Sequence, residues 1–427
     1  MGAKTTKHAR QGAVVDRDGP AREEAGRMRA SGESRTVAVA GVDFGWGSSG
    51  KLSAVLAALQ SRGGERSRFV GLASGLGRPV LAGSPVERWF DLPEAEPERE
   101  LARIVREQQV AAALVVLDGG LARALGDCGV PVVFVDSLPF LWTEGDRAEL
   151  PLDAEVYCAQ RCVDLPPECT GVLADVRRLR WVDAVIAGGG AGRRAAPGPR
   201  PRRALVSLGG LRAPQLDDWA SYPQLVLPAA LEALAASGVD EVHVAGNLPA
   251  WLAGQLVDSC PVPAATTVGA LAHEDFLHRL AECDVLLTSP GLTTLLEAGR
   301  LAVPTVCLPP QNLSQIFNGR FHERAVGGGS RVVWPKEVFA EDEALALRVG
   351  GEGRALDLIY GGIARAAQQH RRATSAAVRG LVAEALRRVE REPGTDWGAL
   401  TAEVGTGGAA QVADALVEVL GATGPAR

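Results

Sequence analysis

The hydrophobic positions of the chain fall into short continuous runs, and polar or amphipathic segments separate one run from the next. Runs that are apolar throughout are typical of strands buried on both faces of a parallel sheet. In the first part of the chain, strands are predicted at residues 35–42, 68–73, 111–118 and 131–137, followed by a helix-strand pair within 174–188. Amphipathic helices are predicted at residues 52–64 and 97–109.

The same alternation restarts near residue 203. Strands are predicted at 203–210, 241–246, near Thr267, at 285–287 and at 303–308, with helices at 225–236, near Trp251, at 273–281 and from Gly291 or Leu292 to about Gly299. The chain from Val338 onward is predicted to be mainly helical. Strands that alternate with helices predict an α/β fold with doubly wound parallel sheets.

Composition divides the chain into five segments. Residues 1–34 are polar and lack periodicity, which predicts a disordered extension. Residues 35–188 and 204–370 are each predicted to form a Rossmann-like domain. Residues 189–203 are dense in Gly, Pro and Arg, and they are predicted to link the two. Residues 371–427 are expected to add C-terminal helices.

The overall composition is that of a soluble globular protein. A formal net charge of −6 over 427 residues, without basic and aromatic interleaving, argues against a nucleic-acid partner. No apolar run approaches the ~20 residues that cross a bilayer, so no membrane association is expected. Seven scattered Cys favour a reducing cytoplasm, and Cys158, Cys162 and Cys169 match no metal-binding spacing, so no metal site is predicted. The oligomeric state stays open.

The richest stretch of chemistry runs from Cys283 to Asn318. A buried strand is predicted to end at the turn Thr288-Ser289-Pro290-Gly291, and a helix follows. The free N–H groups of a helix start can bind a phosphate, and the hydroxyls of Ser289, Thr293 and Thr294 add donors. Glu297, one turn into the helix, can accept two ribose hydroxyls. In the following loop, the amides of Gln311, Asn312 and Gln315 are suited to sugar hydroxyls.

The order Ser-Pro-Gly-x-Thr-Thr-x-x-Glu-Ala, a strand, and Pro-Gln-Asn-x-x-Gln resembles the donor site of GT-B glycosyltransferases that use UDP-sugars. The bacterial enzyme that adds N-acetylglucosamine to lipid-linked muramoyl peptide has a similar stretch. This resemblance implies two Rossmann-like domains with a cleft between them. It also implies that Ser207, Gly209 and Gly210 contribute to the donor phosphate site, and His322 is a further candidate for the donor.

The glycine-rich segment GVDFGWGSSGK, residues 41–51, admits three interpretations. Its glycines match a dinucleotide fingerprint, but no acid follows the next strand to bind a ribose. Gly45, Gly50 and Lys51 also match most of a phosphate-binding P-loop, and Asp118 could supply the acidic strand of such a kinase. Leu52 stands where a Ser or Thr should hold Mg²⁺, which argues against that reading. The third interpretation is an acceptor-side loop of a GT-B enzyme.

The segments AGVDFGWGSSGKLSAV, GLGRPVL, VDSLPFLW and PPQNLSQ together resemble the cytosylglucuronate synthase family of peptidyl-nucleoside antibiotic pathways. The resemblance extends from about Val37 to the region of His322. It implies transfer of glucuronate from UDP-glucuronate to a ring nitrogen of cytosine, with release of UDP and no further cofactor. It also implies that the acceptor and sugar side includes Gly45, Gly47, Ser48, Ser49 and Lys51.

Such a reaction inverts the anomeric centre in a single displacement, and the nucleophile must lose a proton. Asp43 is the first candidate for the base and Asp136 the second, because each lies at the tip of a predicted strand; a turn cap is the alternative for both. Candidates for the glucuronate carboxylate are Lys51, Arg78 and Arg320, and candidates for stacking on the pyrimidine are Trp46 and Trp142. Two further alternatives are another acceptor and a non-catalytic relative that binds nucleotide or a partner.

Overall fold

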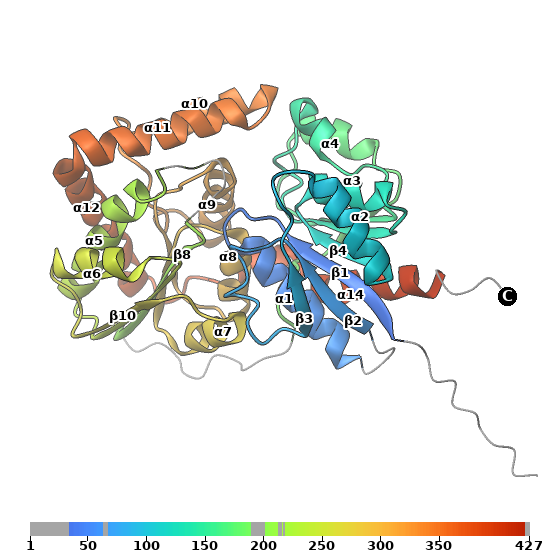
Figure 1. Cartoon of the computed structure of the whole chain (residues 1–427). Coiled ribbons are helices and arrows are strands. Elements are labelled where there is room, and N and C mark those ends of the chain that lie inside the picture. Colours follow the sequence, from blue (N-terminus) through green and yellow to red (C-terminus); the bar gives the residue numbers. More distant parts are fainter. Residues whose placement is uncertain (1–33, 63–66, 189–200, 212–215, 217, 423–427) are drawn as a thin grey trace, which may run out of the picture. The chain divides into compact units, whose positions relative to one another are not determined.

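The computed structural model describes residues 34–62, 67–188, 201–211, 216 and 218–422. The predicted extension at 1–34 lies outside this part except for Ser34, and so does most of the predicted linker. Two sheets, each made of parallel strands, carry the architecture, with helices on both of their faces (Figure 1). Both sheets belong to one compact unit that begins at Ser34.

The first sheet has the strand order β3-β2-β1-β4-β5-β6-β7, and every pairing is parallel. Its strands are β1 (Arg35–Gly41), β2 (Ser67–Leu72), β3 (Val86–Phe90), β4 (Val110–Val116), β5 (Val132–Asp136), β6 (Val156–Gln160) and β7 (Leu179–Val182). The direction of strand succession reverses between β1 and β4. In open α/β sheets such a reversal leaves a crevice at the carboxyl ends of the strands, where ligands bind.

The second sheet is also parallel, with the order β10-β9-β8-β11-β12. Its strands are β8 (Arg203–Gly209), β9 (Glu241–Gly246), β10 (Ala265–Gly269), β11 (Val285–Thr288) and β12 (Thr305–Cys307). Its succession reverses between β8 and β11. The two segments predicted to contact a donor follow these two strands, so they lie at the crevice that this topology creates.

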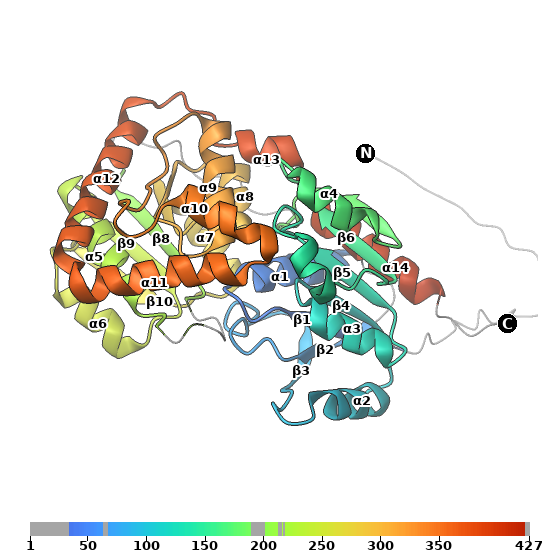
Figure 2. The same cartoon turned by 90° about the horizontal axis from the view of Figure 1, so that it is seen from above.

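The helices that cover the first sheet are α1 (Gly47–Ser61) and α14 (Gly408–Ala422) on one face and α2 (Pro97–Glu107) and α3 (Gly119–Asp127) on the other. A short helix, α4 (Pro167–Ala174), precedes β7. Although α14 comes from the C-terminus, its apolar side packs on α1 and on β4 to β7, and Figure 2 shows it beside that sheet. The end of the chain therefore contributes to the core of the first sheet.

The remaining helices belong to the second sheet and its surroundings. They are α5 (Ser221–Ala236), α6 (Ala250–Asp258), α7 (His273–Glu282), α8 (Leu292–Arg300), α9 (Leu313–Val326), α10 (Glu341–Leu347), α11 (Gly353–Gln369), α12 (Arg371–Arg391) and α13 (Ala399–Val404). Helix α12 packs along α5, and α13 packs on α8 and α9. Two 3₁₀ helices, η1 (Glu144–Glu149) and η2 (Arg348–Gly350), also contact each other.

The fold class predicted from the alternation is confirmed, with two parallel doubly wound sheets. The helix-strand pair predicted within 174–188 is present but begins earlier: its helix is α4, which ends at Ala174, its strand is β7, and the apolar run that follows forms no strand. Asp183 N donates to the Gln411 side chain, and Val185 N donates to the Gln160 side chain. The run is apolar because Ala184, Val185 and Ile186 are buried between the cores, not because it extends a sheet.

Two strands went unpredicted. In the edge strand β3, most side chains are at least partly exposed and Glu and Arg are included, so no continuous apolar run marks it. All residues of β6 are buried, but its five positions follow a polar stretch and carry Tyr157 and Gln160. In neither case does the pattern of hydrophobic residues alone indicate a strand.

Candidate functional site

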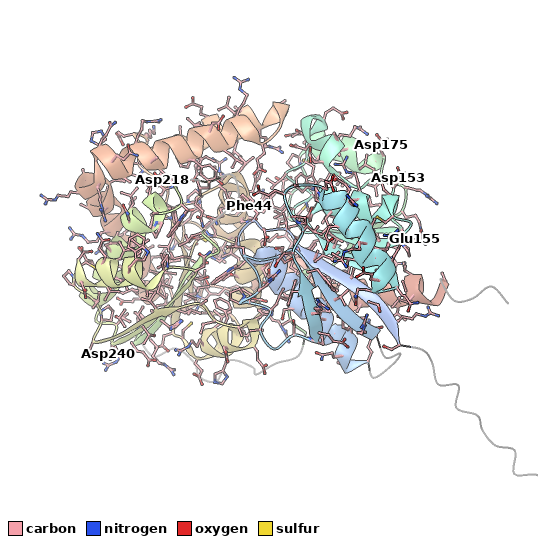
Figure 3. All side chains as sticks on the ribbon, in the orientation of Figure 1. Phe44, Asp153, Glu155, Asp175, Asp218 and Asp240 are labelled. Carbon is pink, nitrogen blue, oxygen red and sulfur yellow. The ribbon has the colours of Figure 1, made fainter. Side chains whose placement is uncertain are left out.

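The loops that follow the strands of both sheets line one cavity of about 470 Å³. The residues predicted for catalysis, for the donor and for the acceptor side all line it except Ser49 and Asp136, whereas the further candidates Arg78, Arg320 and His322 do not. Trp46 and Trp142 also lie in its wall, and so does Phe44, which stands on the loop between β1 and α1 (Figure 3). The two halves of the molecule therefore share one candidate site.

The glycine-rich loop after β1 touches the loop after β8. A Cβ on Gly210 would lie 2.7 Å from two backbone atoms of Gly45, which leaves no room for a side chain there. Gly45 itself has φ 68°, a left-handed conformation that favours glycine. Ser48 donates its hydroxyl hydrogen to Val42 O at 2.8 Å, and Ser49 packs against Gly77. These two serines therefore shape the loop.

Asp43 lines the cavity and also fastens a second loop. Its two carboxylate oxygens accept hydrogen bonds from the backbone N–H groups of Gly75 and Leu76, each at 3.1 Å. Asp118, at the end of β4, lines the cavity as well and caps α3 by accepting from Leu121 N. Burial raises the pKa of the Asp118 carboxyl, and the charge of Asp43 adds to this effect. The carboxyl ends of β1 and β4 thus place two acids close together.

Asp136 does not line the cavity and is fully buried behind its wall. Its carboxylate accepts from Leu138 N, from the Trp142 indole N–H at 2.8 Å and from the Tyr157 hydroxyl at 2.9 Å. Burial raises its pKa to about 6, although these hydrogen bonds oppose the shift. Asp136 therefore holds in place the segment from Ser137 to Trp142, which forms part of the cavity wall.

Lys51 crosses from the first half to the second. Its ammonium donates to Thr293 Oγ1 at 2.7 Å, and that hydroxyl donates to Gly47 O at 3.2 Å. The side chain is only 1% exposed, and this burial lowers the pKa of Lys51 to about 8 against the opposing charge of Glu297. The lysine is therefore a desolvated cation at the start of α8.

Of the three cations predicted for a sugar carboxylate, Lys51 lines the cavity and the two arginines do not. Arg78 donates to Ala73 O and pairs with Asp91. Arg320 pairs with Glu341 and Asp342. Both guanidinium groups therefore bind carboxylates outside the cavity.

The start of α8 lies in the cavity with its free backbone N–H groups and the hydroxyls of Thr293 and Thr294. Gly291 is its N-cap, in extended conformation with no side-chain cap. The hydroxyl of Ser289 shares a 2.8 Å hydrogen bond with Tyr222 OH, which donates to Pro309 O. An anion at this helix start would meet unscreened N–H dipoles.

Glu297, one turn further on, is paired with a histidine. A hydrogen bond of 2.7 Å joins its Oε1 to Nε2 of His273, and both side chains are buried. Burial opposes a charge on His273 and Lys51 repels it, but the charge and hydrogen bond of Glu297 raise the pKa of His273 overall. His273 appeared in the sequence only as a helix start, because a partner 24 positions away along the chain gives no local signal.

The amide loop is largely held together by its own side chains. Asn312 Oδ1 accepts from Gln315 N at 3.1 Å and so caps α9, and it also accepts from the Ser314 hydroxyl. Gln315 Oε1 accepts from Gln311 N at 2.9 Å. The carbonyl oxygens of Asn312 and Gln315 are therefore occupied within the loop, and a ligand would meet mainly their N–H groups.

His322 does not line the cavity, so the structure places it away from a bound donor. Its ring stacks on Trp397 with centroids 6.2 Å apart, and burial lowers its pKa to about 4. Conversely, the cavity includes Ser137, Glu352 and Tyr360, which the sequence analysis did not single out. Ser137 lies within the segment VDSLPFLW, whereas Glu352 and Tyr360 come from the C-terminal helical region, where no motif marks them.

The described residues contain no group of three or more His, Cys, Asp or Glu side chains arranged to hold a metal ion. Within the same residues, none of the helices combines the length and the apolar character that crossing a membrane requires.

No protein-family model matches the chain, and no curated protein matches it. Among solved structures, UGT89C1 of Arabidopsis thaliana complexed with quercetin is similar over 91% of this chain and 100% of that chain, with 13% identity and a TM-score of 0.50. The spinosyn rhamnosyltransferase SpnG covers 84% of this chain and 99% of its own, with 18% identity and a TM-score of 0.48. MurG of Acinetobacter baumannii is similar over 82% of this chain and 99% of that chain, with 16% identity and a TM-score of 0.43.

At these identities the likeness concerns the fold. Together with the two parallel sheets, it assigns the chain to the GT-B fold of glycosyltransferases.

Proposed function

We propose that the protein is a glycosyltransferase that uses a nucleotide sugar, with its donor site at the carboxyl edge of the second sheet. One observation carries this proposal: the start of α8 and the cationic Lys51 of the other half meet in a single cavity. A helix start with two threonine hydroxyls and an adjacent ammonium is suited to a diphosphate. The GT-B fold supports the same reading.

Each part of the donor has a proposed partner. The diphosphate lies against the backbone of Gly291, Thr293 and Thr294 and near the loop from Ser207 to Gly210. The ribose hydroxyls reach Glu297 Oε2, since Oε1 is bonded to His273. The amide N–H groups of the loop at 311–315 bind sugar hydroxyls. As the bond between the sugar and the diphosphate breaks, Lys51 and the α8 dipole stabilise the charge that develops on the leaving group.

The donor that we propose is UDP-glucuronate, and the acceptor is cytosine or a close pyrimidine, with inversion and release of UDP. The support is the resemblance of residues 40–55, 75–81, 135–142 and 309–315 to the cytosylglucuronate synthase family, which acts in nucleoside antibiotic biosynthesis. Lys51 is the cavity-lining member of the three cations considered for a uronate carboxylate. Because a side-chain cation and a helix dipole already face the diphosphate, we propose turnover without a divalent metal or other cofactor.

The test is a panel of UDP-glucuronate, UDP-glucose and UDP-N-acetylglucosamine, each with cytosine or uracil, followed by UDP release and product mass. We expect UDP and a glucuronylated base from UDP-glucuronate with cytosine, in EDTA as in Mg²⁺. Release with another pair would keep the enzyme class and change the substrates. Tight UDP binding without release from any pair would instead favour a non-catalytic nucleotide-binding relative.

A further inference from the structure

Glu352 is a cavity carboxylate contributed by the second half. It immediately precedes α11, and it shares the cavity wall with Ser137, Leu138 and Trp142 of the first half. The charges of Asp146 in η1 and Glu352 interact, which places the two carboxyl groups near each other. The start of α11 therefore adjoins the segment that closes the first-half side of the cavity.

An arginine fixes this arrangement across the two halves. Arg348, in η2, is 4% exposed and donates to the carbonyl oxygens of Phe140 and Leu141 at 3.1 and 3.2 Å. It also pairs with Glu168 and lies over the Phe317 ring. Because Arg348 is only four positions from Glu352, these bonds hold the start of α11 against the 137–142 segment.

Glu352 differs from the other acids near the cavity in its hydrogen bonding. Asp43 receives two backbone N–H groups, Asp118 caps a helix and Asp136 receives three donors. Among the described residues, no donor is bonded to the Glu352 carboxylate. Its oxygens are therefore available to a molecule in the cavity.

The surroundings of Glu352 suit a group that gains and loses a proton near neutral pH. Burial raises the pKa of its carboxyl to about 7, and the charge of Asp146 adds to that effect. Tyr360, eight positions further along the chain in α11, also lines the cavity. Burial, and after it the charge of Glu352, raises the pKa of the Tyr360 phenol. A general base is most effective when its pKa lies near the working pH.

The same part of the cavity has features of an acceptor site. The Ser137 hydroxyl is 1% exposed and, within the described residues, has no hydrogen-bond partner. The indole of Trp142 is fixed by its bond to Asp136 and offers a flat apolar surface. An unpaired buried hydroxyl beside a fixed aromatic ring suits a small planar molecule with polar edges.

We propose that Glu352 is the general base of the transfer reaction, an inference that rests on the function proposed above. The acceptor N–H nitrogen attacks the anomeric carbon and forms the new carbon–nitrogen bond. The bond from that carbon to the diphosphate oxygen breaks, and its electron pair leaves with the diphosphate. The acceptor proton passes to a carboxylate oxygen of Glu352, so charge and atoms balance without any other reactant.

The experiment compares wild type, Glu352→Gln and Asp146→Asn, with the exposed Glu337→Gln as a matched control. For Glu352→Gln we expect kcat to fall by ~10²–10⁴-fold, the range for a general base, while UDP affinity is retained. The acidic limb of the wild-type pH profile of kcat/KM, near pH 7, should vanish in this variant. Glu337→Gln should behave as wild type.

Asp146→Asn provides a second readout if Glu352→Gln folds poorly. Removing the neighbouring negative charge lowers the pKa of Glu352, so the acidic limb should move to lower pH while the base is retained. An unmoved limb would overturn the proposal, and so would a Glu352→Gln variant with near-wild-type rate; both leave the glycosyltransferase function standing. Wild type that turns over no donor–acceptor pair would overturn that function and this inference with it.

Discussion

The two sides of the cavity differ in how their residues are distributed along the chain. On the donor side, most of the residues that would hold a nucleotide lie within 289–315, in one strand-helix-strand unit and its next loop, and the loop from Ser207 to Gly210 and Lys51 complete the set. On the acceptor side, the wall combines the ends of β4 and β5, the 137–142 segment and the start of α11. Phosphate recognition is local because one helix start supplies several N–H groups. Recognition of a planar acceptor needs several elements to converge.

Lys51 comes from the first half and contacts Thr293 on the donor side. Removing its charge should have the largest effect on the rate. Lys51→Met keeps the length and apolar stem but deletes the ammonium that faces Thr293. We expect kcat to drop by ~10²–10³-fold, the usual loss for one electrostatic contact to a developing charge. The exposed Lys336→Met is the control. Equal rates in Lys51→Met and Lys336→Met would show that the donor side stabilises the leaving group without the ammonium of Lys51.

Glu297 tests the donor side alone. Glu297→Gln keeps the shape of the side chain and removes the charge that would accept ribose hydroxyls. UDP affinity should weaken by ~1–3 kcal/mol, the scale of hydrogen bonds to a charged group, which calorimetry would measure. Unchanged UDP affinity would show that Glu297 does not bind the ribose. The carboxylate would then serve only to hold His273.

The sequence predicted the fold, and it placed the start of α8 after a buried strand, for a physical reason. The central strands β8 and β11 are apolar runs, and the turn from Ser289 to Gly291 ends the second of these runs at the carboxyl edge of the sheet. The roles of His273 and Glu352 could not be predicted, because their significance depends on tertiary neighbours. Asp136 is marked in the sequence by its position at the tip of a strand, and only the structure shows that three donors surround it.

The buried charge of Lys51 should also appear as a dependence of stability on pH. Its pKa is lowered to about 8 in the folded protein, whereas the unfolded chain keeps the ordinary value near 10.5. Between these two values the unfolded state binds more protons, so the free energy of unfolding due to this group rises with pH. From pH 7.5 to 9.5, wild type should gain about 1–2 kcal/mol relative to Lys51→Met.

Urea unfolding of both proteins at the two pH values measures this difference, and other titrating groups cancel in the comparison. A gap between wild type and Lys51→Met that stays constant with pH would show that Lys51 is solvated in the folded protein. In that case, its cation would be a weaker partner for the leaving diphosphate.

Asp43→Asn should have the smallest effect on the rate. It tests whether the base comes from the first half, as Asp43, or from the second half, as Glu352. Asn offers one acceptor oxygen where Asp43 now receives the N–H groups of both Gly75 and Leu76. One hydrogen bond is lost, so we expect a stability cost of ~1 kcal/mol, measured by urea unfolding. If Glu352 is the base, the rate should change by less than about tenfold, since only the position of the loop is affected.

The pH profile decides what a larger loss of rate would mean. With Glu352 as the base, the acidic limb of kcat/KM near pH 7 persists in Asp43→Asn and disappears in Glu352→Gln. A fall of ~10²–10⁴-fold in Asp43→Asn, together with loss of that limb, would instead make Asp43 the base. The first half would then supply both the acceptor wall and its proton acceptor, and α11 would serve only to close the cavity.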